Sequence, residues 1–481
     1  MYAGNGGQTS VNVGGSGGGG APHASGGSSA MAESNDLDAL VFEFGTAKCK
    51  FGYAGEDFPR VYESPVHLAD GEDARACTRR AALMETDYEA MAQWLFDAAG
   101  SRLQTKLSEH PLLLVERPFA IPDELTQTSG DDDDAVNKMK KPSDEKTSSK
   151  KRDLKARERL VEVLMEQMDL PALFCAKSAV LTCYANARTS GLVVEMGATY
   201  TSVTSVYEGY AFAYPKSQMQ LFGGHDLDAF LRYKLHAQLN APPSSPSTAD
   251  GEAAPSPAKK PRRSPFYWWS RAVDAKESGL CRVADGPFDE AQNTQLPKIS
   301  YELPDKTIVQ LGTERFSVAE QYFTPPESAN AEGGDVVQTY DDDAMANELG
   351  VKRGVNLPQW ICETGAMTTE AELRKELFQN VVLTGGSSSF ENLPARLERE
   401  IIVAQSAFQS GTPGASTAGF GGGSGLGNVR VKLVAAHAQE RRIGSFLGGS
   451  ILASLGSFHE MWMSKAEYAE HGAALIHKKC P

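Results

Sequence analysis

Two short stretches, residues 41–57 and 191–201, share one pattern, and this pattern constrains the fold more than any other feature of the chain. Each reads as an apolar strand that ends in a carboxylate, Glu43 or Glu195, followed by a turn of small residues and a second strand. Neither turn leads into the Gly-Lys-Ser/Thr helix start of a Walker loop. Two such hairpins facing each other can hold phosphate groups from both sides with backbone N–H groups. The pattern therefore predicts a bipartite phosphate-binding site.

Composition narrows the class of protein. With 481 residues, the chain has room for roughly two to four domains or subdomains. Its net charge of −15 argues against a protein built to grip nucleic acid, so no direct sequence-specific nucleic-acid contact is expected. No apolar run reaches the ~20 residues of a membrane span, and the N-terminus lacks the apolar block of a secretory signal. We therefore expect a soluble intracellular protein with no membrane contact.

The cysteines and histidines give little sign of a metal site. Seven cysteines are scattered without a Cys-x-x-Cys pair, which is typical of unpaired thiols in a reducing compartment. His471, His477 and Cys480 lie close together near the C-terminus, where a metal site is conceivable. Their spacing matches no common ligand set, so the sequence does not favour a metal there.

Segments of low-complexity composition interrupt the chain. Residues 1–38 are rich in Gly and Ser, and we expect them to be a disordered tail. Three further segments are predicted to be surface insertions: the charged residues 128–152, the Pro-rich and basic residues 241–265, and the Gly-rich residues 409–428. Such insertions cost little stability, because loop-closure entropy grows only slowly with loop length.

Between these segments, strands and helices alternate, as in an α/β protein of two related lobes. Besides the two hairpins, the apolar patterns predict strands over residues 112–115, 381–384 and 429–434. They predict helices over residues 154–168, 180–187 and 393–402.

Together with blocks further along the chain, these residues resemble actin and its nuclear relatives. The blocks follow the family's order and span nearly all of residues 40–481 outside the insertions; they are Phe51–Asp57, Val180–Gly191, Tyr207–Ala211, Tyr301–Asp305, Gly312–Phe316, Val382–Gly386, Glu440–Arg442, Gly448–Phe458 and Met461–Trp462. The resemblance implies the two-lobed α/β fold of actins, sugar kinases and heat-shock ATPases, with a nucleotide cleft between duplicated lobes. It implies a first lobe over 39–190, a second over 191–434, and a C-terminal segment, 435–481, that returns to the first lobe.

Three departures from conventional actin look like the nuclear actin-related proteins of chromatin-remodelling and histone-acetyltransferase complexes. Ala198 stands where conventional actin has a second Asp, and the chain carries Ser464-Lys465-x-x-Tyr468 and ends in Lys479-Cys480-Pro481. The resemblance therefore implies a nuclear protein. A basic cluster within the Pro-rich insertion agrees with a nuclear-import signal, and its residues are Lys259, Lys260, Arg262 and Arg263.

By the same resemblance, specific residues are expected to bind ATP. The phosphates would lie against the two turns and Lys50, through Gly45, Thr46, Ala47, Gly197, Ala198 and Thr199. The adenosine would lie against Gly385, Gly386 and Ser387, with Lys276 and Glu277 lining the base and ribose. Gly224 corresponds to a cleft glycine of the second lobe, and Arg442 is also expected to bind the nucleotide. Mg²⁺ would be held by Glu43 and Glu195, where the family has Asp. Because Mg²⁺ wants near-ideal octahedral geometry, the longer arms leave three outcomes open: the ion shifts, the side chains fold back, or the metal binds poorly.

Two substitutions argue against an enzyme. Ser178 and Ser202 stand where conventional actin has a water-orienting Gln and a His, and a hydroxyl on one carbon reaches less far than either. We expect little or no hydrolysis, although weak ATPase activity is not excluded. The chain between Pro59 and Trp94 is also shorter than the corresponding actin segment, which implies that the filament-contact loop is largely missing.

The resemblance implies a structural and regulatory subunit that binds actin or another actin-related protein on a long helix of a remodeller scaffold. The family's docking surface corresponds to Phe458, Met461 and Trp462, although each of these could instead be core. The acidic surface favours basic partners such as histones. The main alternative is a cytoskeletal actin-like ATPase that assembles filaments. A sugar kinase or chaperone-type ATPase lacks support, because the block Gly448–Phe458 looks specific to actin relatives.

Overall fold

The computed structural model describes residues 38–64, 88–118, 154–240, 265–302, 306, 308–323, 354–410 and 429–480. The chain divides into two compact units, Met1–Leu37 and Asp38–Pro481, and every element below belongs to the second. Apart from a few edge residues, the predicted tail 1–38 and the insertions 128–152, 241–265 and 409–428 lie outside the described residues. The basic cluster 259–263 also lies outside them.

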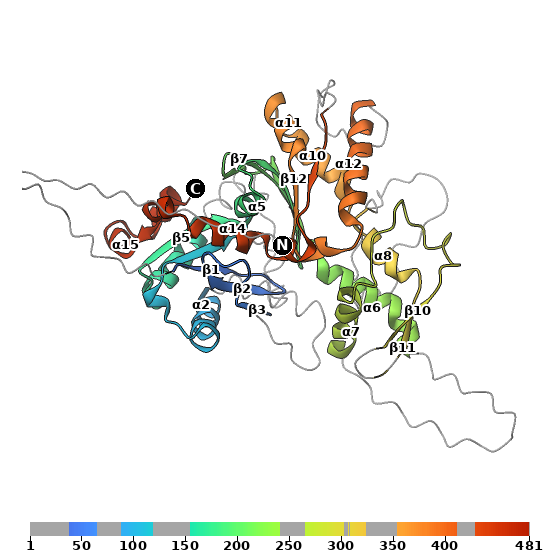
Figure 1. Ribbon diagram of the computed structural model, residues 1–481, viewed down its shortest axis with the longest axis horizontal. Helices are drawn as coiled ribbons and strands as arrows, with labels where there is room; N and C mark the ends of the chain where they lie inside the picture. Colours follow the sequence, from blue (N-terminus) through green and yellow to red (C-terminus); the bar gives the residue numbers. More distant parts are fainter. Residues whose placement is uncertain are drawn as a thin grey trace, which may run out of the picture. The chain divides into compact units, whose positions relative to one another are not determined.

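One six-stranded sheet is built from the N-terminal part of the chain and carries a C-terminal strand at one edge (Figure 1). Strand β1 runs antiparallel to β2 and parallel to β4, and β4 runs parallel to β5. The order is β14-β5-β4-β1-β2-β3, with bounds β1 Leu40–Glu43, β2 Cys49–Tyr53, β3 Val61–Glu63, β4 Leu112–Glu116, β5 Ala172–Lys177 and β14 Met463–Ser464.

A second six-stranded sheet repeats this pairing. Strand β6 runs antiparallel to β7 and parallel to β12, and β12 runs parallel to β13. The bounds are β6 Gly191–Met196, β7 Thr201–Tyr207, β8 Tyr210–Ala211, β9 Ser217–Gln220, β12 Val381–Thr384 and β13 Leu433–Val434. Because both sheets place an antiparallel hairpin beside two parallel strands, the fold is a duplication, as the sequence predicts. A separate antiparallel pair is formed by β10 Ile299–Glu302 and β11 Ile308–Leu311.

Helices connect and cover these sheets. On the first sheet they are α2 Tyr88–Ala98, the π-turn η1 Ala99–Leu103, the 3₁₀ turn η2 Leu107–Glu109, a helix over 154–162 that continues into the π-turn η3 Val163–Gln167, and α5 Ser178–Ala185. With the second sheet lie α6 Gly224–Asn240, α7 Pro265–Glu277, α8 Glu314–Glu320, α10 Leu357–Ala366, α11 Ala371–Gln379, η5 Gly386–Ser389 and α12 Leu393–Ser410. The C-terminal helices are α13 Ala438–Arg442, α14 Gly444–Ala453, η6 Gly456–Met461, α15 Lys465–His471, η7 Ala473–Leu475 and α16 Ile476–Lys479.

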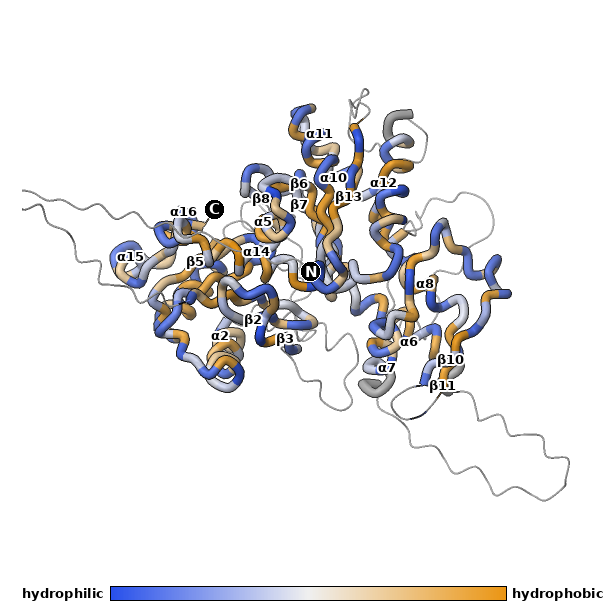
Figure 2. The backbone as a smooth tube through the Cα atoms, in the orientation of Figure 1, coloured by the Kyte–Doolittle hydropathy of each residue, from blue (hydrophilic) through white to orange (hydrophobic). Residues whose placement is uncertain are grey.

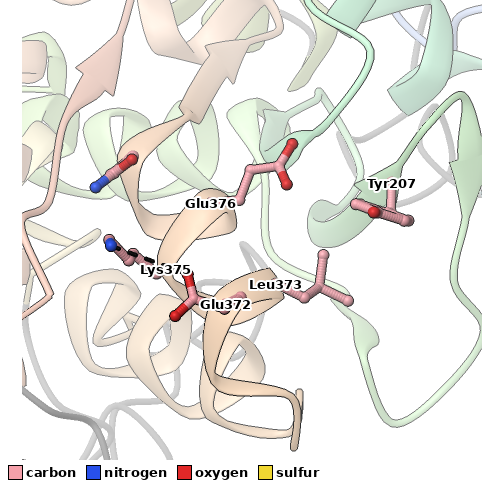
Figure 3. A pocket seen from close by; sticks show the side chains of 6 residues that line it. Tyr207, Glu372, Leu373, Lys375 and Glu376 are labelled. Atoms are coloured by element: carbon pink, nitrogen blue, oxygen red, sulfur yellow. Dashed lines mark ion pairs between the residues drawn. The ribbon is translucent and has the colours of Figure 1, made fainter.

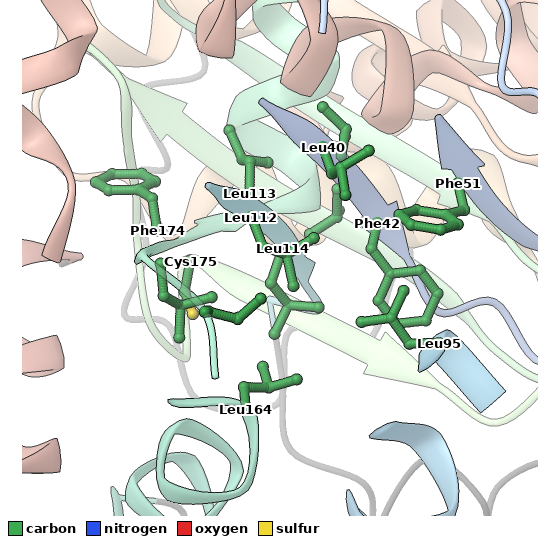
Figure 4. Close-up of a cluster of buried hydrophobic side chains, with 14 of the residues drawn as sticks. Leu40, Phe42, Phe51, Leu95, Leu112, Leu113, Leu114, Leu164, Phe174 and Cys175 are labelled. Carbon is green, nitrogen blue, oxygen red and sulfur yellow. The ribbon is translucent and has the colours of Figure 1, made fainter. Parts of the chain in front are cut away.

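Each sheet has its own apolar core. Figure 4 shows the first, where aliphatic and aromatic side chains of β1, β2 and β4 interdigitate with Leu95 of α2 and with Leu164. The second core gathers side chains from β6, β12, α6, α8, α10 and α12. Hydrophobic residues concentrate on the strands of both sheets, whereas α15 is largely hydrophilic (Figure 2). Among the described residues, no helix is long and apolar enough to cross a bilayer.

Residues after 443 pack against the first sheet. Helix α14 packs against α5 and β1, and β14 pairs with β5. Ser464 forms a capping box with Glu467 at the start of α15. Tyr468 of α15 donates its hydroxyl to Glu166 Oε1 at 2.7 Å. The residues that mark the departure from conventional actin therefore tie the C-terminal helices to η3.

Most predicted elements lie where the apolar pattern puts them, and three differ. The helix predicted over 180–187 is α5, which begins and ends two residues earlier, at Ser178 and Ala185. Residues 429–434 form a ladder only at Leu433 and Val434, because the parallel pairing with β12 covers just these two positions. Helix α12 continues past residue 402 to Ser410. Its buried side chains, among them Ile401 and Gln405, extend beyond the apolar stripe that signals the helix in the sequence.

Candidate functional site

The turns of the two predicted hairpins meet, although they belong to different sheets. Thr46 Oγ1 and Thr199 Oγ1 lie 3.3 Å apart. Each turn is tight: a Cβ added to Gly45 would lie 2.4 Å from Lys48 O, and one added to Gly197 would lie 2.9 Å from Tyr200 O. We call this place the hairpin junction and define it as turns 44–48 and 197–200 with the side chains of Glu43, Lys50 and Glu195.

Glu43 and Lys50 form a buried ion pair beneath the first turn. Glu43 ends β1 and Lys50 lies opposite it on β2. Burial alone would lower the pKa of the Lys50 ammonium, but the charge of Glu43 and their hydrogen bond outweigh it, so this pKa is raised. The second oxygen of Glu43, Oε2, accepts a hydrogen bond of 2.6 Å from Ser445 Oγ on α14. Both carboxylate oxygens of Glu43 therefore have partners within the chain.

Glu195 occupies the matching position at the end of β6. Its Oε2 accepts a hydrogen bond of 3.0 Å from Ser178 Oγ at the start of α5. Burial and the nearby charge of Glu43 raise the pKa of the Glu195 carboxyl to about 7, against the opposing effects of Ser178, Lys50 and Arg117. The turns that follow Glu43 and Glu195 meet at Thr46 and Thr199, so the two acids share one site and do not lie at opposite ends of the molecule.

Arg117 and Ser445 are site residues that the sequence reasoning missed. Arg117 follows β4, and its guanidinium lies 5.7 Å from the centre of the Tyr200 ring, next to the second turn. Its positive charge acts on Glu195. The position of Arg117, directly after a strand parallel to β1, is a signal that could have found it, because parallel strands end at the same edge of a sheet. Ser445 has no such local signal.

The second group of predicted residues converges on one wall of the second lobe. Ser387 Oγ donates to Gly197 O at 3.1 Å, and Lys276 Nζ donates to Gly224 O at 2.9 Å. A Cβ added to Gly224 would lie 2.8 Å from Ser387 Oγ and 3.6 Å from Ala198 Cα. Turn 197–200, η5, α6 and α7 therefore meet at Gly224, where a side chain would require Ser387 to turn away.

Asp228 holds Lys276 from the other side. Lys276 Nζ lies 2.6 Å from Asp228 Oδ1, whose side chain is almost fully buried. Burial raises the pKa of Asp228 to about 6 in spite of this ion pair. Asp228 is a further residue of the wall that the sequence reasoning did not name.

Three predicted residues lie at the margin of this wall. A Cβ at Gly386 would meet nothing within 4 Å, so Gly386 faces open space at the start of η5. Arg442 is exposed and donates from Nε to Ser389 Oγ at 3.0 Å. Glu277 is exposed at the end of α7, and no contact of the described residues draws it toward the turns.

The donor set fits a tightly held Mg²⁺ poorly. Mg²⁺ requires oxygen ligands in near-octahedral arrangement. Glu43 gives one oxygen to a lysine ammonium and the other to a serine hydroxyl, and Glu195 gives Oε2 to the hydroxyl of Ser178. In the described part of the chain, no three His, Cys, Asp or Glu side chains form a group that could hold a metal ion.

Ser178 and Ser202, which stand at the positions of the Gln and His of conventional actin, are both buried. Ser178 is buried and bonded to Glu195. Ser202 pairs directly with Glu195 across the β6–β7 ladder, and its hydroxyl is buried. Neighbours in an antiparallel ladder lie on one face of the sheet, so Ser202 and Glu195 line the same side. Both hydroxyls are short, and the Ser178 hydroxyl is occupied by Glu195.

Two other places lie apart from the hairpin junction, the C-terminal histidines with Cys480 and a surface pocket. Among the described residues His471 lies near Glu470, His477 contacts Glu158 Oε1 at 3.1 Å, and Cys480 Sγ accepts from Cys175 N at 3.3 Å, so these three side chains do not converge. A separate pocket of about 300 Å³ lies beside α11, and Figure 3 shows the side chains that line it. Its lining is polar and includes the Lys375–Glu372 ion pair, and its residues are Tyr207, Glu372, Leu373, Lys375, Glu376 and Gln379. None of them belongs to the hairpin junction.

Two duplicated sheets whose hairpin turns meet define a two-lobed α/β fold of the actin, sugar-kinase and heat-shock ATPase class. The sequence matches the actin family over residues 147–481. It is 30% identical to Actin-related protein 4 of Oryza sativa subsp. indica, over 93% of this chain and 99% of the relative. It is 29% identical to Actin-related protein 4 of Arabidopsis thaliana, with the same coverage of both chains. The chain therefore belongs to the actin family and is an actin-related protein similar to these two.

Proposed function

We propose that the hairpin junction binds ATP with little or no hydrolysis, and that the protein is a structural subunit of a nuclear chromatin-remodelling or histone-acetyltransferase complex. The observation that supports nucleotide binding best is the 3.3 Å contact between Thr46 and Thr199. It brings the backbone N–H groups of two tight turns to one place, and such turns bind phosphate.

The same geometry supports a non-catalytic role. Hydrolysis requires a group that positions water against the terminal phosphate. Ser178 donates to Glu195, and Ser202 is enclosed within β7, so neither short side chain is placed for that task. A bound ATP would then act as a long-lived structural ligand that stiffens the contact between the lobes.

A surface on the C-terminal helices supports the partner proposal. Of the three residues implied by the resemblance, Phe458 and Trp462 are core, because they pack with Phe174 at ring-centroid distances of 4.7 and 6.4 Å. Met461, in contrast, is exposed, and so are Ile451 and Leu455. We assign the docking of an actin or actin-related partner, or of the scaffold helix, to these three exposed apolar side chains and name them the apolar rim.

Purified full-length protein tests the nucleotide proposal. Isothermal titration with ATP should give saturable binding, and phosphate release at saturating Mg-ATP should not proceed beyond one turnover. A Gly45→Val variant is the control for binding at the junction, since its side chain would collide with Lys48 O. Absence of ATP binding in the well-folded protein would refute the proposal.

Affinity purification from nuclear extract tests the assembly. Recovery of remodeller or acetyltransferase subunits together with actin supports the chromatin role. The competing function, a filament-forming ATPase, would instead give sustained phosphate release and sedimentable polymer with recovery of cytoskeletal proteins alone.

A further inference from the structure

The charges at the hairpin junction are balanced without a metal ion. Glu43 is neutralised by Lys50 and further bonded by Ser445. Glu195 accepts a hydrogen bond from Ser178. In a site designed around a divalent cation, these carboxylate oxygens would face the ion or its waters. Here the chain itself supplies their partners.

Two cations lie at the junction, Lys50 beside Glu43 and Arg117 on the side of Glu195. Lys50 is buried opposite Glu43, and its ammonium also feels the charge of Glu195. Arg117 reaches the other side of the junction, next to Tyr200, and its charge acts on Glu195. A guanidinium is always charged and presents several N–H donors, which suits phosphate oxygens.

We propose that the junction binds the polyphosphate of a nucleoside triphosphate without a tightly held divalent cation, and that Arg117 supplies the positive charge while Lys50 offsets the charge of Glu43. This inference rests on the proposed ATP binding. The ion pair with Lys50 offsets the charge of Glu43, which would otherwise repel the approaching phosphates. Arg117 then stabilises the phosphates directly, as a fixed cation beside the second turn.

Titration of the full-length protein with ATP in EDTA and in Mg²⁺ tests the proposal. Here the dissociation constants should agree within about threefold. Binding that weakens by more than about tenfold in EDTA would overturn this inference and leave ATP binding itself established. Absence of binding in both conditions would refute the proposed function and this inference with it.

Variants separate the role of the cations. Arg117→Ala should weaken ATP binding in EDTA by about tenfold. The loss should be smaller in Mg²⁺, because the added ion replaces the lost charge. Arg117→Lys, which keeps the charge, should retain most of the affinity. Arg60→Ala is the matched control, since Arg60 is an exposed arginine that pairs with Glu56 away from the junction. Unchanged affinity of folded Arg117→Ala in EDTA would overturn the assignment of Arg117.

A second pair of variants tests the occupied carboxylates. Ser178→Ala with Ser445→Ala frees one oxygen on each acid. If internal hydrogen bonds keep the carboxylates from the metal, this double variant should gain Mg²⁺ dependence of at least about threefold in its ATP affinity. Circular dichroism and thermal unfolding establish that it is folded. A folded double variant with the same affinity in EDTA and in Mg²⁺ would contradict the proposed cause.

Discussion

Thr46 Oγ1 and Thr199 Oγ1 lie 3.3 Å apart, although 153 residues separate them in the chain and they end hairpins of different sheets. The two hydroxyls lie at the long end of hydrogen-bonding distance. Their contact fixes the relation of the two turns in the absence of ligand, and a phosphate group between them would have to replace it.

Cysteines at these two positions should therefore form a disulfide. The double variant Thr46→Cys with Thr199→Cys places two sulfurs where the hydroxyls meet, within reach of one bond after a small rotation. Mild oxidation should remove two hydrogens from the intact mass, and trypsin digestion should yield one linked peptide pair. Each single variant serves as the control, because the six native cysteines among the described residues are buried. ATP present during oxidation should slow the reaction; equal rates with and without it would argue against phosphate binding between the turns.

Gly385 and Gly386 are neighbours with opposite tolerance for a side chain. Gly385 has φ +95°, and a Cβ there would lie 2.3 Å from Met196 O, whereas a Cβ on Gly386 meets nothing within 4 Å. Gly385→Ala should reduce the free energy of unfolding by roughly 3 kcal/mol or more, through strain and the clash with β6. Gly386→Ala should change it by less than about 1 kcal/mol. Urea unfolding measures both; a tolerated Gly385→Ala would contradict the tight approach of η5 to β6.

The sequence predicts the local parts of this architecture and misses the contacts that cross it. An apolar run with a terminal carboxylate is a local pattern, so the hairpins at Glu43 and Glu195 could be located correctly. Ser445 is 402 residues away from its partner Glu43, and no spacing in the sequence reveals that pair. For the same reason, the sequence does not reveal that Phe458 and Trp462 lie in the core. The sequence does not distinguish an aromatic residue in a core from one on a docking surface. The packing against Phe174 shows that both belong to the core.

Asp228 should make the stability of the ligand-free protein depend on pH. Its pKa in the folded state is about 6, above the ordinary aspartate value of 3.8. Between these two pH values, the carboxyl is therefore protonated in the folded state and ionised in the unfolded state. Stability is therefore greatest below pH 3.8 as far as this group is concerned, and it falls as pH rises toward 6. The loss is at most about 3 kcal/mol.

Asp228→Asn should flatten this part of the pH profile, since an amide does not titrate. Urea unfolding at intervals between pH 4 and pH 7 would measure the slope rather than the absolute stability, which the altered contact with Lys276 also affects. Asp274→Asn on the exposed face of α7 is the matched control. Parallel profiles for wild type and Asp228→Asn would show that Asp228 does not titrate in this range.

The basic cluster in the Pro-rich insertion should direct nuclear import. Replacing all four of its basic residues by glutamine should move a fluorescently tagged full-length chain from the nucleus to the cytoplasm; they are Lys259, Lys260, Arg262 and Arg263. Imaging of living cells gives the nuclear-to-cytoplasmic ratio. A control with Lys138, Lys140 and Lys141 of the charged insertion replaced by glutamine removes positive charge elsewhere in the chain. An unchanged ratio in the cluster variant would show that import uses another signal.

The apolar rim and the aromatic core beneath it should respond differently to substitution. Met461 is 47% exposed and Leu455 is 47% exposed, whereas Trp462 is 6% exposed. Aspartate at Leu455 or Met461 places a charge where a partner's apolar face would bury it, so co-purification with actin or the scaffold should drop severalfold while thermal stability stays unchanged. Trp462→Ala should instead cost about 3–5 kcal/mol of stability, because it empties space against Phe174 and Phe458. Full recovery of partners by the stable Leu455→Asp and Met461→Asp variants would place the docking surface elsewhere on the molecule.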